Sequence, residues 1–286
     1  MDLVESLAGR TAFIVGSAKN AGKTTLLNFA LRRLRPLGGV GFLSIGVDGE
    51  ERDLVFGCPK PRIRAEAGDL LVTSDRMLQA SELGWELLEV FPGSTVLGRL
   101  VLARVRRGGT VELCGPENNE RLSQMLTALR GRGARTILVD GAVDRMTQVA
   151  SLPGAGFVHV VRADPARLDS ARDAMRLAHS LAAVPLAEGL PEDGTAVFSG
   201  ALTRGRLAAL PLSTRALVLE DFTKVFLTWR EWKAATQRLD MRFARRWELL
   251  FFCVVLSDVS REDFASGLEP DLLARILFNP YEVACA

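Results

Sequence analysis

The stretch that most constrains the fold of this chain is Gly16-Ser-Ala-Lys-Asn-Ala-Gly-Lys-Thr-Thr25. It follows the apolar run Thr11–Val15, which has the length of a buried strand, and it leads into the amphipathic run Leu26–Leu34. Strand, glycine-bearing loop, Gly-Lys-Thr and helix are the order of elements that a phosphate-binding loop (P-loop) requires. A strand–turn–helix that needs Gly22 only for its turn is the alternative. We favour the P-loop, because all its parts stand in order, and we predict a nucleoside triphosphate as the ligand.

Each part of this loop has a chemical role in the predicted site. Backbone N–H groups of the loop can bind phosphate oxygens, and the N-terminus of the following helix adds partial positive charge. Lys23 is expected to reach the β- and γ-phosphates, and the Thr24 hydroxyl is expected to bind Mg²⁺. The predicted nucleotide-binding residues are Gly16, Ser17, Lys19, Asn20, Ala21, Gly22, Lys23, Thr24 and Thr25.

The loop departs from the usual P-loop pattern at one position. That pattern has a glycine five residues before Gly22, where this chain has Ser17, with Gly16 one position earlier. Lys19 is four residues before Lys23, whereas dimeric ATPases of the ParA/MinD type have their signature lysine five residues before it. The sequence therefore does not predict that subclass.

Two acidic residues are predicted to act beside the loop. Thr136–Asp140 is an apolar strand that ends in an acid, the form of a Walker B strand, which places a carboxylate near Mg²⁺. Asp48 follows the apolar run Gly41–Ile45 and would lie at the carboxyl edge of the sheet, where open α/β folds bind ligands. The predicted catalytic residues are Lys23, Asp48 and Asp140, and the predicted metal ligands are Thr24, Asp48 and Asp140.

Both assignments have plainer alternatives. Asp140 can simply end a strand, and the loop that contains Asp48 can be an acidic, solvated surface. Glu50, Glu51 and Asp53 are further candidates for the metal or water contact within that loop.

The order of the elements predicts an α/β fold, with a mostly parallel sheet flanked by helices as in a P-loop NTPase. A β insertion is expected at about 85–114, where strand-like runs are joined by Arg107-Gly-Gly109. Helices are expected at about 118–129, 164–183, 203–209, 229–239 and 261–277, and strands at 156–161, 195–198, 215–219 and 249–256. We predict a nucleotide-binding domain over 1–190. Residues 191–286 are expected to be a subdomain or the continuation of the same sheet.

Composition excludes some classes of function. The 286 residues carry a formal net charge of +2, which gives no electrostatic case for nucleic acid binding. The longest apolar run near the end, Leu249–Leu256, is too short to span a membrane. The acidic start of the chain shows no signal peptide, and the four scattered cysteines predict free thiols and no zinc site. A cytoplasmic location is expected.

The base of the nucleotide is weakly specified. The guanine-reading pattern Asn/Thr-Lys-x-Asp would have to be Val161-Arg-Ala-Asp164, which fits poorly, and Asp164 serves equally well as a helix cap. We therefore expect ATP rather than GTP, with Mg²⁺ as the metal.

Several stretches carry a resemblance to a known family. The Asn-x-Gly-Lys-Thr-Thr core of the loop is similar to that of small P-loop NTPases such as MobB. More of the chain resembles the P-loop subunit of the lysine 5,6-aminomutase reactivase (KamB-like), over about residues 11–145. The stretches that carry this likeness are Ser44-Ile-Gly-Val-Asp-Gly-Glu50, Lys60-Pro61, Gly68-Asp69-Leu70 with Thr73, Thr95-Val-Leu-Gly98, Leu113-Cys-Gly-Pro116 and Val139-Asp-Gly-Ala142.

The resemblance implies an ATP-dependent helper of an aminomutase that uses cobalamin and pyridoxal phosphate. Such a reactivase would act with a second reactivase subunit and use ATP hydrolysis to release damaged cobalamin. The γ-phosphate and Mg²⁺ would order the Asp48 loop, and hydrolysis would release it. A P-loop small-molecule kinase or ATP-dependent ligase is one alternative, and a nucleotide-gated metallocofactor chaperone is another. A homodimer is compatible with each of these.

Overall fold

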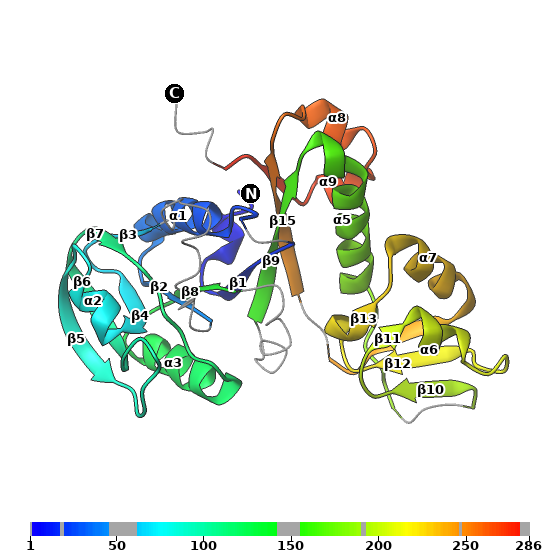
Figure 1. Cartoon of the computed structure of the whole chain (residues 1–286), viewed down its shortest axis with the longest axis horizontal. Helices are drawn as coiled ribbons and strands as arrows, with labels where there is room; N and C mark the ends of the chain where they lie inside the picture. Colours follow the sequence, from blue (N-terminus) through cyan, green and yellow to red (C-terminus); the bar gives the residue numbers. More distant parts are fainter. Residues whose placement is uncertain are drawn as a thin grey trace.

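The computed structural model describes residues 2–17, 20–45, 62–141, 155–189, 193–245 and 248–280. Within these ranges nine strands form one sheet in the order β16-β15-β9-β1-β8-β2-β4-β6-β5 (Figure 1). All neighbouring strands are parallel except for the pairs that β6 makes with β4 and β5. The strands are β1 (Thr11–Gly16), β2 (Val40–Ser44), β4 (Leu70–Ser74), β5 (Gly84–Val90), β6 (Leu100–Arg107), β8 (Thr136–Asp140), β9 (Ala155–Ala163), β15 (Glu248–Leu256) and β16 (Ile276–Phe278). The α/β fold with a mostly parallel sheet is confirmed.

Strands are present in the β insertion expected at about 85–114, and two of them extend the main sheet. β5 and β6 make its antiparallel edge, and the short strand β7 (Gly109–Val111) turns away to pair with β3 (Ile63–Ala65). The reason is that β6 is apolar on both faces. Val101 belongs to the core on one side of the sheet, whereas Leu102 belongs to the core on the other.

Helices cover both faces of the sheet. On one face α1 (Lys23–Leu34) buries Leu26, Leu27, Leu31 and Leu34 against the core that contains Ile14 and Leu138. Each fully buried leucine contributes about 2 kcal/mol relative to an exposed one. On the other face lie α3 (Asn119–Gly131), α5 (Leu168–Ala182), α8 (Arg261–Ala265) and α9 (Pro270–Leu273). Figure 1 shows α1 and α3 on opposite sides of the strands.

The helix expected at 118–129 is α3, and its four predicted core residues are buried: Leu122, Met125, Leu126 and Leu129. Asp164 caps the next helical segment, as expected, because its carboxylate accepts a hydrogen bond from the N–H of Arg167. That segment begins as a 3-10 turn, η5 (Pro165–Arg167), before α5. Other short elements are η1 (Glu5–Leu7), η2 (Arg35–Leu37), η6 (Phe222–Lys224) and α2 (Asp75–Gln79).

Residues 195–243 form a smaller unit beside the main sheet (Figure 1). Its parallel sheet has the order β10 (Thr195–Phe198), β12 (Ala216–Leu219), β14 (Asp240–Phe243), and a separate pair joins β11 (Leu202–Thr203) to β13 (Val225–Phe226). Two helices, α6 (Arg204–Ala208) and α7 (Trp229–Arg238), complete the unit. The chain then returns to the main sheet as β15 and β16. Residues 191–286 thus hold both a subdomain and a continuation of the sheet.

The prediction of a single helix at 261–277 is wrong. The structure has α8, α9 and the strand β16 in that range. Ser260 caps α8, and Pro270 begins α9, so each helix is a separate short segment. Residues 276–278 are extended because they pair with β15.

The smaller unit is attached to the main sheet mainly through α5. Met175 of α5 packs in the main core, whereas Leu181 packs in the core of the smaller unit. The indole N–H of Trp232 donates a 2.9 Å hydrogen bond to the hydroxyl of Ser180. A second contact stacks Phe222 on Phe157 of β9, with ring centroids 5.3 Å apart.

Candidate functional site

The turn between β1 and α1 is held by two residues with positive φ. Asn20 has φ 60° and Gly22 has φ 104°, and α1 begins at the next residue. Glycine adopts this left-handed conformation without the steric cost that a Cβ carries. A Cβ at Gly22 would also lie 2.9 Å from Cγ2 of Val255. Gly22 is therefore required both by its own backbone and by the approach of β15.

Lys23 folds back over the end of β1. A Cβ at Gly16 would lie 3.1 Å from Cγ and 3.2 Å from Cδ of Lys23. Because Gly16 has no side chain, the side chain of Lys23 can lie against the turn at this position. The N–H of Ser17 donates a 2.9 Å hydrogen bond to the carbonyl of Val160, which fixes the start of the turn on β9.

The other predicted residues of the turn differ in exposure. Ala21 is buried in the core beneath α1, Thr24 is half-buried, and the side chains of Ser17, Asn20 and Thr25 are exposed. Lys19 lies outside the described residues, and so do Asp48, Glu50, Glu51 and Asp53. Their roles stay predictions.

Asp140 lies on the strand next to β1 and on the face that α1 covers. It is in register with Ile14, and successive side chains of a strand alternate between the two faces. Leu138 and Ile14 both pack in the α1-side core, so Asp140 shares their face. The carbonyl of Asp140 accepts a 2.9 Å hydrogen bond from the N–H of Ile45, which ties this strand end to β2. The structure thus brings the predicted acid to the edge of the sheet from which α1 starts.

Ser44 is a residue of this edge that the sequence analysis did not assign a role. It ends β2 in register with Asp140, and Phe42 is in register with Leu138 on the same face. Ser44 is 7% exposed, and its hydroxyl has no hydrogen-bond partner among the described residues. The only signal in the sequence is a serine at the end of an otherwise apolar run.

Residues 112–115 cross the carboxyl ends of β2 and β4 and pack directly on Ser44. A Cβ at Gly115 would lie 1.7 Å from the carbonyl oxygen of Ser44, so only glycine fits there. Thr73 holds the segment in place, because its hydroxyl donates to the carbonyl of Glu112 at 2.9 Å and accepts from the N–H of Cys114 at 3.0 Å.

The oxygen atoms near the turn are of the kind that Mg²⁺ prefers. They are the hydroxyls of Thr24 and Ser44 and the carboxylate of Asp140, and hard cations favour oxygen ligands. Across the described ranges, no three His, Cys, Asp or Glu side chains are grouped so as to hold a metal. A Mg²⁺ ion here would need phosphate and water oxygens as well, which is how proteins usually bind it with nucleotides. The residues present fit that kind of site.

Two further groups with shifted pKa values lie on β9 and β15. Burial lowers the pKa of His159 on β9 to about 4, so its imidazole is neutral at pH 7. Burial also raises the pKa of the Cys253 thiol to about 12. Cys253 and Cys114 form no disulfide within the described part of the chain, and Cys58 and Cys285 lie outside it.

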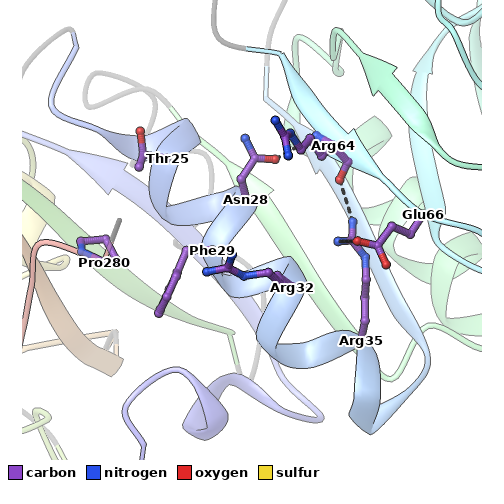
Figure 2. A pocket seen from close by; sticks show the side chains of 8 residues that line it. All are labelled: Thr25, Asn28, Phe29, Arg32, Arg35, Arg64, Glu66 and Pro280. Carbon is purple, nitrogen blue, oxygen red and sulfur yellow. Dashed lines mark hydrogen bonds and ion pairs between the residues drawn. The ribbon is translucent and has the colours of Figure 1, made fainter. Parts of the chain in front are cut away.

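A groove of about 430 Å³ runs along the outer side of α1, beginning at Thr25 (Figure 2). At the far end of the groove, Arg35 already forms ion pairs with the carboxylates of Glu66 and Asp69. The side-chain amide of Asn28 is also hydrogen-bonded within the protein: it donates to the carbonyl of Arg62 and accepts from the N–H of Arg64. Among the described residues that line the groove, Glu66 is the only acid, and it pairs with Arg35.

We found no significant match of the chain to a protein-family model, to a curated protein or to a solved structure. No helix among the described residues has the length and apolar character needed to cross a membrane. Fold and site therefore rest on the topology and contacts above.

Proposed function

We propose that this chain is a P-loop NTPase, which binds a magnesium–nucleoside triphosphate at the Gly16–Thr25 turn and hydrolyses it. The observation that carries the proposal is the contact of Lys23 with Gly16, beside a helix start preceded by a left-handed Gly22. The lysine side chain and the N-terminus of α1 thus both border the turn, which suits the binding of a polyphosphate. Asp140 on the neighbouring strand supplies a carboxylate at the same edge.

The residues would divide the work as follows. Lys23 would neutralise charge on the β- and γ-phosphates, and backbone N–H groups of the turn would orient them. Thr24 and Asp140 would hold Mg²⁺, directly or through water, and Asp48 is proposed to complete the metal or water contact. When bound, Mg²⁺ would neutralise charge that develops on the phosphates. We propose ATP as the nucleotide, with GTP as the alternative.

We further propose that hydrolysis drives reactivation of an aminomutase that uses cobalamin and pyridoxal phosphate. This step rests on the resemblance of residues 11–145. Several of the resembling stretches meet in the fold: Gly115 packs on Ser44, and Thr73 bonds the segment of Cys114. The Cys114 sulfur lies 3.8 Å from the Thr95 hydroxyl. Resembling stretches that are distant in sequence thus contact one another in the fold, which supports the view that they belong to one structural unit.

The test is Mg²⁺-dependent binding and hydrolysis of ATP and GTP by the purified full chain, with and without such an aminomutase. Lys23→Ala should abolish binding, whereas Lys233→Ala, which removes an exposed lysine of α7, should not. ATP turnover that rises with the aminomutase supports reactivation. Turnover that rises only with a small-molecule acceptor favours a kinase or ligase. Nucleotide binding without turnover favours the gated chaperone, and no binding at all refutes the proposed NTPase.

A further inference from the structure

Ser44 combines features that a strand residue with a purely structural role does not need. It shares the α1-side face with Asp140, its partner in the register between β2 and β8. Neighbouring strands lie about 4.8 Å apart, so the two side chains are adjacent at the carboxyl edge. Ser44 is the last residue of β2, and the loop expected to contact the γ-phosphate follows it.

The hydroxyl of Ser44 is buried without a hydrogen-bond partner in the described part of the chain. A buried polar group in that state costs about 1–3 kcal/mol. Alanine at this position would avoid the cost and keep the strand. A buried hydroxyl without a partner in the protein is expected where a ligand supplies the hydrogen-bond partner.

The backbone of Ser44 is held by two neighbours. Gly115 packs on its carbonyl, and Asp140 of β8 is its register partner. Because the backbone is held at this position, the hydroxyl needs only a rotation about the Cα–Cβ bond to meet a ligand at the edge. Such preorganisation is what a group needs in order to orient a ligand.

We propose that Ser44 is a positioning residue for the magnesium–nucleotide, and that its hydroxyl hydrogen-bonds the hydrated metal beside Asp140. This inference rests on the proposed nucleotide site and adds a residue to it. A serine hydroxyl both donates and accepts, so it can bond a metal-bound water or orient a carboxylate. Outer-shell partners of this type typically change metal affinity by 10–100-fold.

The experiment compares Ser44→Ala with the wild type by calorimetric titration of ATP, with Mg²⁺ and with EDTA, and by thermal unfolding without nucleotide. We expect the gain in ATP affinity that Mg²⁺ provides to fall about tenfold in the variant. Binding in EDTA should be unchanged, and the unfolding midpoint should stay or rise because an unsatisfied hydroxyl is gone. Ser213→Ala, an exposed serine of the smaller unit, is the matched control.

The outcomes separate the inference from the function it rests on. If the wild type binds ATP with Mg²⁺ and Ser44→Ala keeps the full Mg²⁺ gain, the inference is overturned while the NTPase proposal stands. If the wild type binds no nucleotide, both fall. Should Ser44→Ala not fold, Ser44→Cys replaces the hydroxyl by a weak hydrogen-bonding thiol of similar shape, and the same loss of the Mg²⁺ gain is expected.

Discussion

Lys23 lies across Gly16, so that a Cβ on the glycine would stand 3.1 Å from the lysine Cγ. The contact joins the last residue of β1 to the first residue of α1 across the turn. The position of the lysine side chain therefore depends on the absence of a side chain at residue 16. A substitution at residue 16 should therefore affect ATP binding more than the stability of the fold, because the long lysine side chain can move without disturbing the core.

Gly16→Ala should weaken ATP binding more than it destabilises the fold. The added methyl group would displace Lys23 by a few tenths of an ångström, it would stand 3.3 Å from Cβ of the buried Ala21, and the backbone of Gly16 needs no positive φ. We expect about a tenfold loss of affinity, equivalent to about 1.4 kcal/mol. Calorimetric titration measures the affinity and urea unfolding the stability. Gly131→Ala, at the end of α3 with open space around it, is the control and should leave binding unchanged. Unaltered affinity in Gly16→Ala would show that the lysine position is irrelevant to the ligand.

Gly22→Ala should instead destabilise the fold. A left-handed conformation costs a residue with a Cβ about 1–2 kcal/mol, and the contact with Val255 adds to it. We expect the free energy of unfolding to fall by about 3 kcal/mol. In a Val255→Ala background the same substitution should cost about 1 kcal/mol less, because only the backbone strain remains. Equal costs in both backgrounds, measured by urea unfolding, would argue against the contact with β15.

Local patterns predict several elements of the fold, and one of them, β8, carries part of the proposed site. The spacing of Leu122, Met125, Leu126 and Leu129 predicts α3, and the apolar run that ends at Asp140 predicts β8. The range 261–277 was predicted wrongly because β16 has only three residues and forms by pairing with β15. A pairing of this kind depends on contacts distant in sequence, which local periodicity does not contain.

The role we propose for Ser44 has the same origin. Nothing in the run Gly41–Ile45 distinguishes this serine from a tolerated strand residue. Its meaning comes from the register that sets it beside Asp140 and from Gly115, which approaches from a segment about seventy residues away. Lys23 and Thr24, by contrast, are assigned by adjacent residues in a single turn, so sequence reasoning finds them.

The desolvated imidazole of His159 should make stability depend on pH. Its pKa is about 4 in the folded protein and about 6.5 in an unfolded chain, so the unfolded state binds more protons between these values. Stability is therefore complete above about pH 6.5 and declines as the pH falls towards 4. The decline should be on the order of 2–3 kcal/mol. His159→Gln, which cannot titrate, should lose this part of the pH dependence in urea unfolding. Parallel curves for the variant and the wild type would contradict the assignment.

The ion pair between Arg35 and Asp69 should be the most sensitive of the arginine contacts around α1. The side chain of Asp69 is 4% exposed and that of Arg35 13%, and Arg35 also donates to the carbonyl of Arg64. Arg35→Met would leave a buried carboxylate without its cation, which typically costs about 3–5 kcal/mol.

The matched comparison is Arg33→Met in the last turn of α1, two residues before Arg35. Arg33 pairs with Asp2, but its side chain is 48% exposed, and exposed pairs contribute at most about 1 kcal/mol. Urea unfolding should therefore separate the two variants clearly. A loss of less than about 1 kcal/mol in Arg35→Met as well would contradict the prediction that Asp69 needs this cation.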